Sequence, residues 1–307
     1  MSRLPDRRKF LGRAALAAGA IGVLPRRLLS APASLPADLV LVKGEPGPAV
    51  RRAISALGGM GRFVKPGQRV VLKPNMSFPT GVEAGATTHP EVVAEVARLV
   101  AEAGAKEILV ADYPLRRPEV CVSRSGILEA CARIPRTQVR FFAEEKFFEE
   151  VGVPRGKVLD RVKVLKPLLE ADIYLNLPTA KTHGAVGVSL GLKNQMGLIW
   201  DRNAFHTRFD LGQAIADLAS ALKPQLTILD ASRALVTGGP GGPGKVVWLH
   251  RMVAGVNPVE VDALGVTLTP WYDQVLRPDQ VSHLRAARAL GLGDLDPEKY
   301  RYQQVEG

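Results

Sequence analysis

The hydrophobic pattern is clearest between residues 69 and 112. An apolar run at 69–72 predicts a short buried strand, and a second run at 106–111 predicts another. Between them, Thr88 and Glu91 have the spacing of a capping box, with Thr88 as the N-cap and Glu91 reaching back. Apolar residues then recur at helical spacing at Val92, Val96, Leu99 and Ala103. Strand, helix and strand in this order predict a βαβ unit with a parallel pair of strands.

The same alternation continues along the chain. Strands are expected at 37–42, 137–142, 171–175 and 226–229, with an antiparallel or edge strand at 246–253. Helices are expected at 48–57, after Asp210 up to Leu222, and at 259–268. This alternation predicts an α/β fold, with a mostly parallel, doubly wound sheet and helices on both faces. We expect a single large domain over 34–274, with 275–307 forming a helical tail packed on it.

The first 33 residues have the pattern of an export signal. Arg7-Arg8 precedes a modestly apolar run of about 11 residues, and Ala31-Pro32-Ala33 has the small-x-small form of a cleavage site. Adjacent arginines indicate the twin-arginine route, whose cargo is exported already folded. The run is too short to span a hydrocarbon core of ~30 Å as a helix, so no permanent membrane span is expected. We therefore predict a periplasmic or extracytoplasmic protein that uses the twin-arginine machinery; an uncleaved leader would act as a tether.

Charge and cysteine content limit the classes of ligand and cofactor that the chain is expected to bind. The leader holds seven basic residues and one acid, so it supplies more than half of the chain's net charge of +11. No Lys/Arg run is interleaved with aromatic residues, which argues against nucleic acid and leaves a small anion as the expected ligand. Only Cys121 and Cys131 are present, so the chain cannot build a 4Fe–4S cluster or an all-Cys zinc site alone. A disulfide is an alternative, but two inert core thiols are the preferred interpretation, because a helix over 126–132 would hold them apart.

Candidate binding residues follow the predicted strands. In doubly wound sheets, ligands bind outside the carboxyl ends of the strands, where these loops converge. The amide and lysine side chains expected to bind an anionic substrate are Lys73, Asn75, Asn176, Lys193 and Asn194. The alternative is that each lysine is a solvated surface charge.

Candidate catalytic groups lie in the same loops. His183, His89 and Lys181 are the expected acid–base residues. His89 also has a structural interpretation, since it lies in the first turn of a predicted helix. His206, His250 and His283 have no supporting context.

Carboxylates at strand ends could hold a cation. Asp112 and Asp230 end two predicted strands and are the candidate ligands of a divalent metal, although they could equally cap helices. Asp262 lies inside a predicted helix. The glycine-rich segment 238–244 fits an anion-binding nest or a surface lid. HExxH and Walker patterns are absent, and no GxGxxG motif lies between a predicted strand and a predicted helix, so zinc peptidase, ATP and NAD functions have no motif support.

Several segments together resemble a known family. They are residues 70–75, 87–93, 102–105 leading to Asp112, 181–183 with 192–194, 238–244 after Asp230, and 258–263. In this order, over about residues 38–268, they resemble the bacterial and archaeal "domain of unknown function 362" family. Many members carry ferredoxin-like 4Fe–4S modules or twin-arginine leaders, so the resemblance implies redox surroundings. This chain lacks the cluster cysteines, and any iron–sulfur function would belong to a redox partner protein.

Two functions remain open from the sequence. The first is an exported enzyme acting on an anionic small molecule, with metal or redox chemistry suggested only by the family. The second is a non-catalytic periplasmic protein that binds or matures a cofactor or metal for a redox partner. The same pocket residues would serve both functions.

Overall fold

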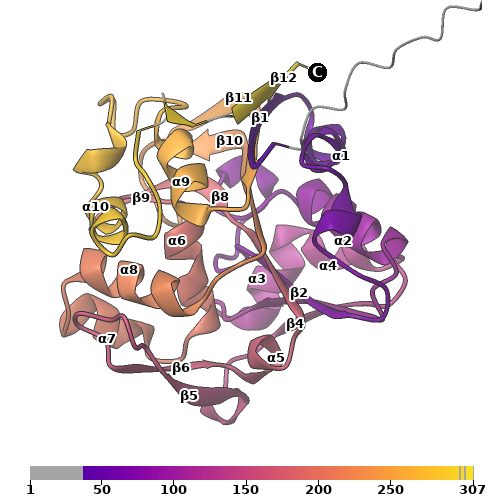
Figure 1. Ribbon diagram of the computed structural model, residues 1–307, viewed down its shortest axis with the longest axis horizontal. Helices are drawn as coiled ribbons and strands as arrows, with labels where there is room; N and C mark the ends of the chain where they lie inside the picture. The colour runs from indigo at the N-terminus through magenta and orange to yellow at the C-terminus, as the bar shows by residue number, and fades with distance from the viewer. Residues whose placement is uncertain (1–36, 297–298, 301, 307) are drawn as a thin grey trace, which may run out of the picture. The chain divides into compact units, whose positions relative to one another are not determined.

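A computed structural model describes residues 37–296, 299–300 and 302–306. The predicted signal peptide, residues 1–33, lies outside the described residues. The chain from Pro36 to Gly307 forms one unit, which contains both the expected α/β domain and the expected tail. A large mixed sheet runs through this unit, with helices against its two faces (Figure 1).

The sheet is parallel on one side and mixed on the other. In spatial order its strands are β12 (Tyr302–Val305), β1 (Leu39–Lys43), β11 (Val246–Gly255), β10 (Leu226–Leu235), β7 (Ile173–Leu177), β2 (Arg69–Pro74), β3 (Glu107–Asp112) and β4 (Thr137–Phe141). From β10 to β4 every neighbouring pair is parallel, whereas β11 is antiparallel to both β10 and β1. The predicted α/β class and mostly parallel sheet are confirmed.

Smaller strands complete the architecture. β8 (Thr179–His183) follows β7 directly, pairs in parallel with the second half of β10, and pairs antiparallel with β9 (Gly187–Ser189). β5 (Phe148–Gly152) and β6 (Arg161–Leu165) form a separate antiparallel pair. The chain therefore turns from β7 into β8 at the carboxyl edge of the sheet, which places the residues of β8 beside the ends of the parallel strands.

Helices bury the two sheet faces in separate cores. Their bounds are α1 Pro46–Ala56, α2 Pro90–Glu102, α3 Pro118–Ser125, α4 Ile127–Cys131, α5 Lys166–Leu169, α6 Gly191–Asn194, α7 Arg202–Thr207, α8 Leu211–Ala221, α9 Pro258–Val266 and α10 Ser282–Ala289. Side chains alternate along a strand, so Val70 and Leu72 pack with α1, α2 and α4, while Val71 faces the core of α8, α9 and α10. Helices on both faces are thus confirmed.

The start of α2 differs from the sequence prediction. His89, and not Thr88, is the N-cap, and its Nδ1 accepts the Glu91 N–H at 3.2 Å. The predicted capping box is therefore wrong. Thr88 is buried against the sheet instead, where its hydroxyl accepts the Asn75 N–H at 2.8 Å and donates to the Leu177 carbonyl at 2.7 Å. Backbone groups at the ends of β2 and β7 need these partners, and that need outweighs the local capping preference. The predicted Asp210 cap of α8 is confirmed.

The C-terminal segment is only partly helical. It contains α10, as expected, but it ends in β12, which pairs in parallel with β1. The expectation of a purely helical tail is wrong because β1 would otherwise leave a free sheet edge, whose N–H and C=O groups accept another strand. β11 is antiparallel, as predicted. It pairs with both β1 and β10, so it lies inside the sheet and not at its edge.

The two cysteines are free and buried, in α3 and α4. Burial raises the pKa of both thiols, that of Cys131 to about 11, which keeps them in the unreactive protonated form. This confirms the prediction of two unpaired core thiols.

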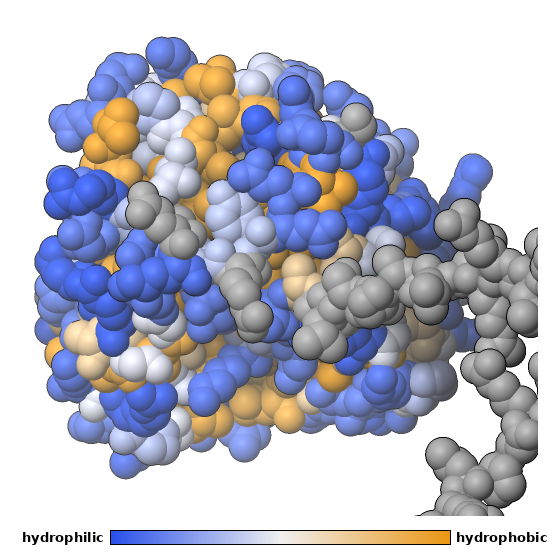
Figure 2. Space-filling view, turned by 45° about the horizontal axis from the view of Figure 1, so that its top comes forward, coloured by the Kyte–Doolittle hydropathy of each residue, from blue (hydrophilic) through white to orange (hydrophobic). Residues whose placement is uncertain are grey.

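The outer surface is mixed in polarity. On the face shown in Figure 2, apolar residues lie in patches between hydrophilic ones, as is normal for the surface of a globular domain. Over the part of the chain that the structure describes, each helix is too short or too polar to cross a bilayer.

Candidate functional site

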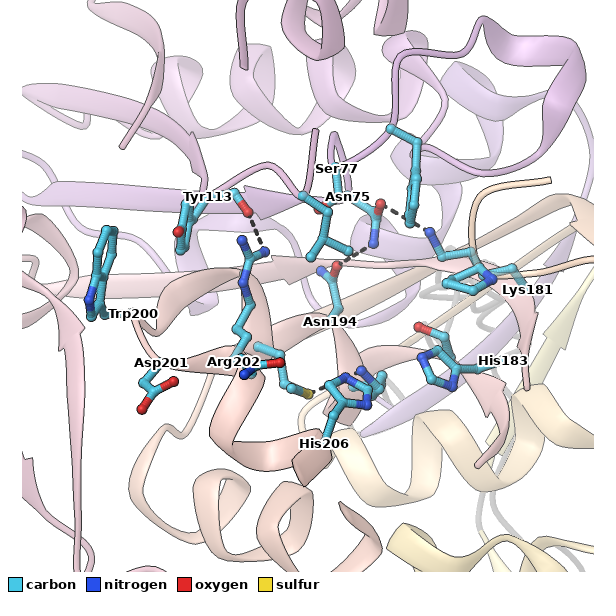
Figure 3. A pocket seen from close by; sticks show the side chains of 18 residues that line it. Asn75, Ser77, Tyr113, Lys181, His183, Asn194, Trp200, Asp201, Arg202 and His206 are labelled. Atoms are coloured by element: carbon cyan, nitrogen blue, oxygen red, sulfur yellow. Dashed lines mark hydrogen bonds between the residues drawn. The ribbon is translucent and has the colours of Figure 1, made fainter. Parts of the chain in front are cut away.

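A cavity of about 470 Å³ lies where the loops after β2 and β3 meet β8, α6 and α7. This volume lies within the range of about 300–1,000 Å³ that is typical of small-molecule sites. Figure 3 shows Tyr113 and Trp200 at one end, Lys181 and His183 at the other, and Arg202 between them. The cavity therefore occupies the carboxyl edge of the sheet, where the sequence predicted ligand binding.

The cavity wall is rich in cationic groups. Lys181, Lys193 and Arg202 all line it. Asp201 is the one lining carboxylate in the described chain, and it caps α7 by accepting the Ala204 N–H at 3.2 Å. Within the described residues, no carboxylate forms an ion pair with any of these three cations. A bound anion would supply the missing counter-charge.

Lys181 projects from the middle of β8 and is fully buried. Its Nζ donates to Asn75 Oδ1 at 3.1 Å and to the Ala86 carbonyl at 2.6 Å, and it lies 4.7 Å from the centre of the Phe78 ring. Burial holds the pKa of Lys181 well below its usual range, because the charged form is poorly solvated there. These contacts fix the position of the amine at the cavity wall.

Lys193 lies on α6 and has far fewer polar contacts. Its side chain is nine-tenths buried, and its Nζ has one hydrogen-bond partner in the described structure, Met196 Sδ at 3.1 Å. Burial, with a smaller contribution from the positive charge of Arg202, lowers the pKa of Lys193 to about 7. Close to neutral pH this amine is therefore divided between its charged and neutral forms.

The short helix α6 is held by a buried carboxylate. Asp262 accepts the backbone N–H groups of Gly191 at 2.6 Å and Leu192 at 2.8 Å. These are unpaired donors at the first turn of α6, and an acidic side chain stabilises such an end. Gly191 is required here because a Cβ would lie 2.7 Å from Asp262 Oδ1. Asp262 thus positions Lys193 and Asn194 without lining the cavity itself.

Below the cavity floor lies a polar network that ties β2, β7 and α6 together. Asn194 lines the cavity; its Oδ1 accepts from Lys73 Nζ at 3.2 Å and Asn75 Nδ2 at 3.1 Å, and its Nδ2 donates to Asn176 Oδ1 at 2.9 Å. Asn75 also lines the cavity, as predicted for a substrate contact. Lys73 and Asn176 are fully buried and do not line it, so the structure gives both a supporting position.

The two aspartates predicted to bind a metal, Asp112 and Asp230, each form an ion pair with a different basic side chain. Asp112 forms a buried ion pair with Lys73 at 3.0 Å and also accepts the Met76 N–H at 2.9 Å. Asp230 pairs with Arg233 at 2.7 Å and accepts the His89 N–H at 2.7 Å. Neither lines the cavity. Across the residues that the structure describes, no group of three or more His, Cys, Asp or Glu side chains is arranged to hold a metal ion.

Two histidines face each other in the cavity wall. The rings of His183 and His206 stack at 5.8 Å between centroids, with 20° between their planes (Figure 3). Burial lowers the pKa of both, that of His183 to about 3 with help from the positive charge of Lys193. Both imidazoles are therefore neutral at pH 7. His89 lies outside the cavity lining, as the N-cap of α2, whereas His206 was given no role by the sequence.

The opposite end of the cavity is aromatic. Tyr113 and Trp200 stack at 5.3 Å between centroids, and the Arg202 guanidinium lies 3.8 Å from the centre of the Tyr113 ring. Arg202 also donates to the Tyr113 carbonyl at 2.6 Å and to the Pro114 carbonyl at 3.1 Å. Sequence reasoning missed this wall because its members lie far apart in the chain and no periodic pattern marks them.

The glycine-rich segment 238–244 contributes to a neighbouring cavity of about 530 Å³. Phe78, His183, His206 and Pro240 line both cavities. Gly239 passes so close to β8 that a Cβ would lie 2.0 Å from the Thr182 carbonyl oxygen, and its N–H donates to Thr182 Oγ1 at 3.0 Å. The segment is therefore packed against the site as a wall.

The fold and this cavity together define an α/β protein with a mostly parallel sheet and a cavity lined by Lys181, Lys193 and Arg202 at its carboxyl edge. The chain belongs to the family described as domain of unknown function DUF362, whose model matches residues 70–267. This confirms the family resemblance that the sequence motifs indicated.

One relative and one solved structure are similar to this chain. The chain is 34% identical over 253 residues to the thylakoid-associated protein sll1697 of Synechocystis sp., covering 80% of this chain and 74% of that protein. Among solved structures it is similar to the lactate racemase apoprotein of Thermoanaerobacterium thermosaccharolyticum, with 14% identity and a TM-score of 0.44. That match covers 71% of this chain and 54% of the racemase, so this chain corresponds to about half of the racemase's length.

Proposed function

We propose that this protein is an enzyme that binds a small organic anion in the cavity and transfers a proton on it. The observation that carries the proposal is the set of three basic side chains, Lys181, Lys193 and Arg202, which have no carboxylate partner in the described structure. Burying such groups without a counter-ion is costly, and a bound carboxylate or phosphate would offset that cost.

The cavity residues would have different roles in anion binding and proton transfer. Arg202 keeps its charge and would hold the anionic group of the ligand, and a bound anion would favour the protonated form of the neighbouring Lys181. Lys193 has a pKa of about 7, and a proton acceptor works best when its pKa lies near the working pH. The neutral imidazoles of His183 and His206 would carry protons between the ligand and solvent.

Calorimetric titration with succinate and with inorganic phosphate tests anion binding. We expect wild-type protein to bind at least one of them, and Lys181→Met to weaken that binding by at least about tenfold, since a charge-assisted contact is worth roughly 1.5–3 kcal/mol. Lys106→Met is the matched control, because Lys106 is exposed and precedes β3 at the opposite edge of the sheet. Equal affinity of all three proteins, or binding by none, contradicts the proposal.

The alternative proposal is a non-catalytic carrier of a cofactor or metal that serves a redox partner. The second cavity favours it, because the two adjoining spaces together suit a ligand larger than a simple acid. Mass spectrometry, absorbance and metal analysis of protein purified after native export test this proposal. A carrier should retain its ligand in His183→Ala, and ligand-free, colourless, metal-free wild-type protein counts against it.

We further propose that the protein works outside the cytoplasm, after folded export. The support is the Arg7-Arg8 pair and the apolar run that follows it. Replacing both arginines by lysine should leave the protein in the cytoplasm, whereas normal export of that variant would refute the twin-arginine assignment.

A further inference from the structure

Lys193 differs from the other buried lysines in how its amine is satisfied. Lys73 Nζ is paired with the Asp112 carboxylate and also donates to Asn194 Oδ1. Lys181 Nζ donates to two oxygens, of Asn75 and Ala86. Lys193 Nζ, in contrast, has only the thioether sulfur of Met196 at 3.1 Å among the described residues. An ammonium group offers three donors, and a thioether is a weak acceptor, so this environment favours the neutral amine.

The amine is also held in place at the cavity wall. Asp262 fixes the first turn of α6, and Met196 contacts the amine from three residues further along the chain. Lys193 is nine-tenths buried and still lines the cavity. A neutral, fixed amine that faces a ligand cavity carries a free electron pair and is a nucleophile for carbonyl carbon.

The neighbours of Lys193 indicate which carbonyl compounds would enter. Arg202 supplies positive charge for a carboxylate in the same cavity, and that carboxylate would favour the protonated form of Lys181. The stacked Tyr113–Trp200 pair offers an apolar wall for the remainder of the ligand. A 2-oxo acid carries its carboxylate directly beside its carbonyl, and therefore places both groups at the same end of a small ligand.

We propose that Lys193 forms a Schiff base with a 2-oxo acid bound in this cavity. This inference rests on the proposed anion-binding function and names its substrate class. The Lys193 Nζ electron pair attacks the ketone carbon, and the carbonyl oxygen takes a proton to give a carbinolamine. Loss of the nitrogen's proton and of the hydroxyl group as water then leaves a carbon–nitrogen double bond, so amine and ketone give imine and one water. His183 and His206 line the same cavity and are placed to carry these protons.

The test is reductive trapping followed by peptide mapping. The full protein is incubated at pH 7 with pyruvate or phenylpyruvate and sodium cyanoborohydride, whose hydride reduces an imine to a stable secondary amine. The modified lysine is then located by mass spectrometry of proteolytic peptides. At pH 7 the neutral fraction of an amine with a pKa near 7 exceeds that of an ordinary exposed lysine by about 10³. A less basic amine is also a weaker nucleophile, which offsets part of this gain in reactivity. We expect labelling at Lys193 to exceed labelling at exposed Lys106 by at least about tenfold.

Variants and non-carbonyl analogues separate the possible outcomes. Lys193→Met should lose the preferential label, and Lys106→Met should keep it, with circular dichroism checking that both are folded. Calorimetry with lactate and phenyllactate, which lack the ketone, reports on anion binding alone. Binding of these hydroxy acids without preferential trapping at Lys193 overturns the Schiff base while leaving the proposed function intact. Uniform labelling of lysines with no binding of the hydroxy acids overturns both.

Discussion

Replacing Lys193 by methionine removes the buried amine while keeping an unbranched side chain of similar length. Burial lowers the pKa of Lys193 to about 7, from 10.5 for a lysine in the unfolded chain. Between these two pH values the unfolded chain binds the proton more readily than the folded protein does, so the stability of the wild type rises with pH through this window. The stability cost is fully present below pH 7 and is lost as the pH approaches 10.5.

The size of the effect follows from the two proton affinities. Each tenfold difference in affinity is worth about 1.4 kcal/mol, so the cost of burying Lys193 is about 4 kcal/mol at pH 7 and about 1.5 kcal/mol at pH 9.5. Methionine carries no such cost at either pH and fits among apolar neighbours. We therefore expect Lys193→Met to be more stable than the wild type by about 4 kcal/mol at pH 7, with the advantage falling to about 1.5 kcal/mol at pH 9.5.

Urea denaturation at the two pH values measures these differences, with unfolding followed by the fluorescence of the three tryptophans. The wild type, Lys193→Met and Lys106→Met are compared in ligand-free form. The exposed Lys106 serves as the control, and its replacement should change the free energy of unfolding by less than about 0.5 kcal/mol at both pH values. The reasoning is refuted if Lys193→Met is no more stable than the wild type at pH 7, or if its advantage does not shrink at pH 9.5.

Three further substitutions test the supports of the site. Asp112→Asn should lower the free energy of unfolding by roughly 3 kcal/mol, because it leaves the Lys73 ammonium buried and unpaired; adding Lys73→Met should recover most of that loss in urea denaturation, and purely additive losses would contradict the pairing. Gly197→Ala should lower the melting temperature, since its Cβ would lie 2.1 Å from Asp112 Oδ1, and an unchanged melting temperature would argue against this close approach. Asp262→Asn should lower the free energy of unfolding by about 1 kcal/mol in urea denaturation and reduce the trapping of a 2-oxo acid at Lys193, because one amide oxygen replaces the two carboxylate oxygens that hold the first turn of α6.

The periodic parts of the fold were predictable from the chain. Alternating apolar runs and helical repeats placed β2, α2, β3 and α9 near their observed bounds, because buried parallel strands and amphipathic helices have strong local signatures. For β10 they located the start, but the strand continues to Leu235 and not only to residue 229. The cap of α2 was assigned to Thr88 because local spacing favoured it, yet Thr88 instead bonds to the ends of β2 and β7. β12 was missed because a four-residue edge strand gains its stability from the partner strand it completes.

The candidate site was predictable in its location but not in the roles of its residues. The strand-end rule placed Lys181, His183, Asn75, Lys193 and Asn194 at one edge, and all five line the cavity. The same rule could not separate these from Lys73, Asn176, Asp112 and Asp230, which it also assigned to strand ends. These four are buried beneath or beside the cavity, and Asp230 lies in the middle of β10 because that strand continues to Leu235. His206 and Arg202 carry no motif. Contacts of α7 with the loop after β3 and with β8 bring them to the wall.

The sequence by itself determined the α/β class, the family, the edge of the sheet where chemistry is concentrated, and the shortage of cysteine for a cluster. These features depend on residue order and composition, and interactions between residues close in the chain are enough to indicate them. Only the tertiary structure decided which polar groups neutralise one another and which are left facing the cavity. Charge pairing, burial and pKa depend on which groups folding brings together. Lys73 pairs with Asp112, whereas among the described residues the Lys193 amine has only the Met196 sulfur as a hydrogen-bond partner. That difference is visible only after the chain has folded, and it makes Lys193 the leading candidate for the chemistry of this protein.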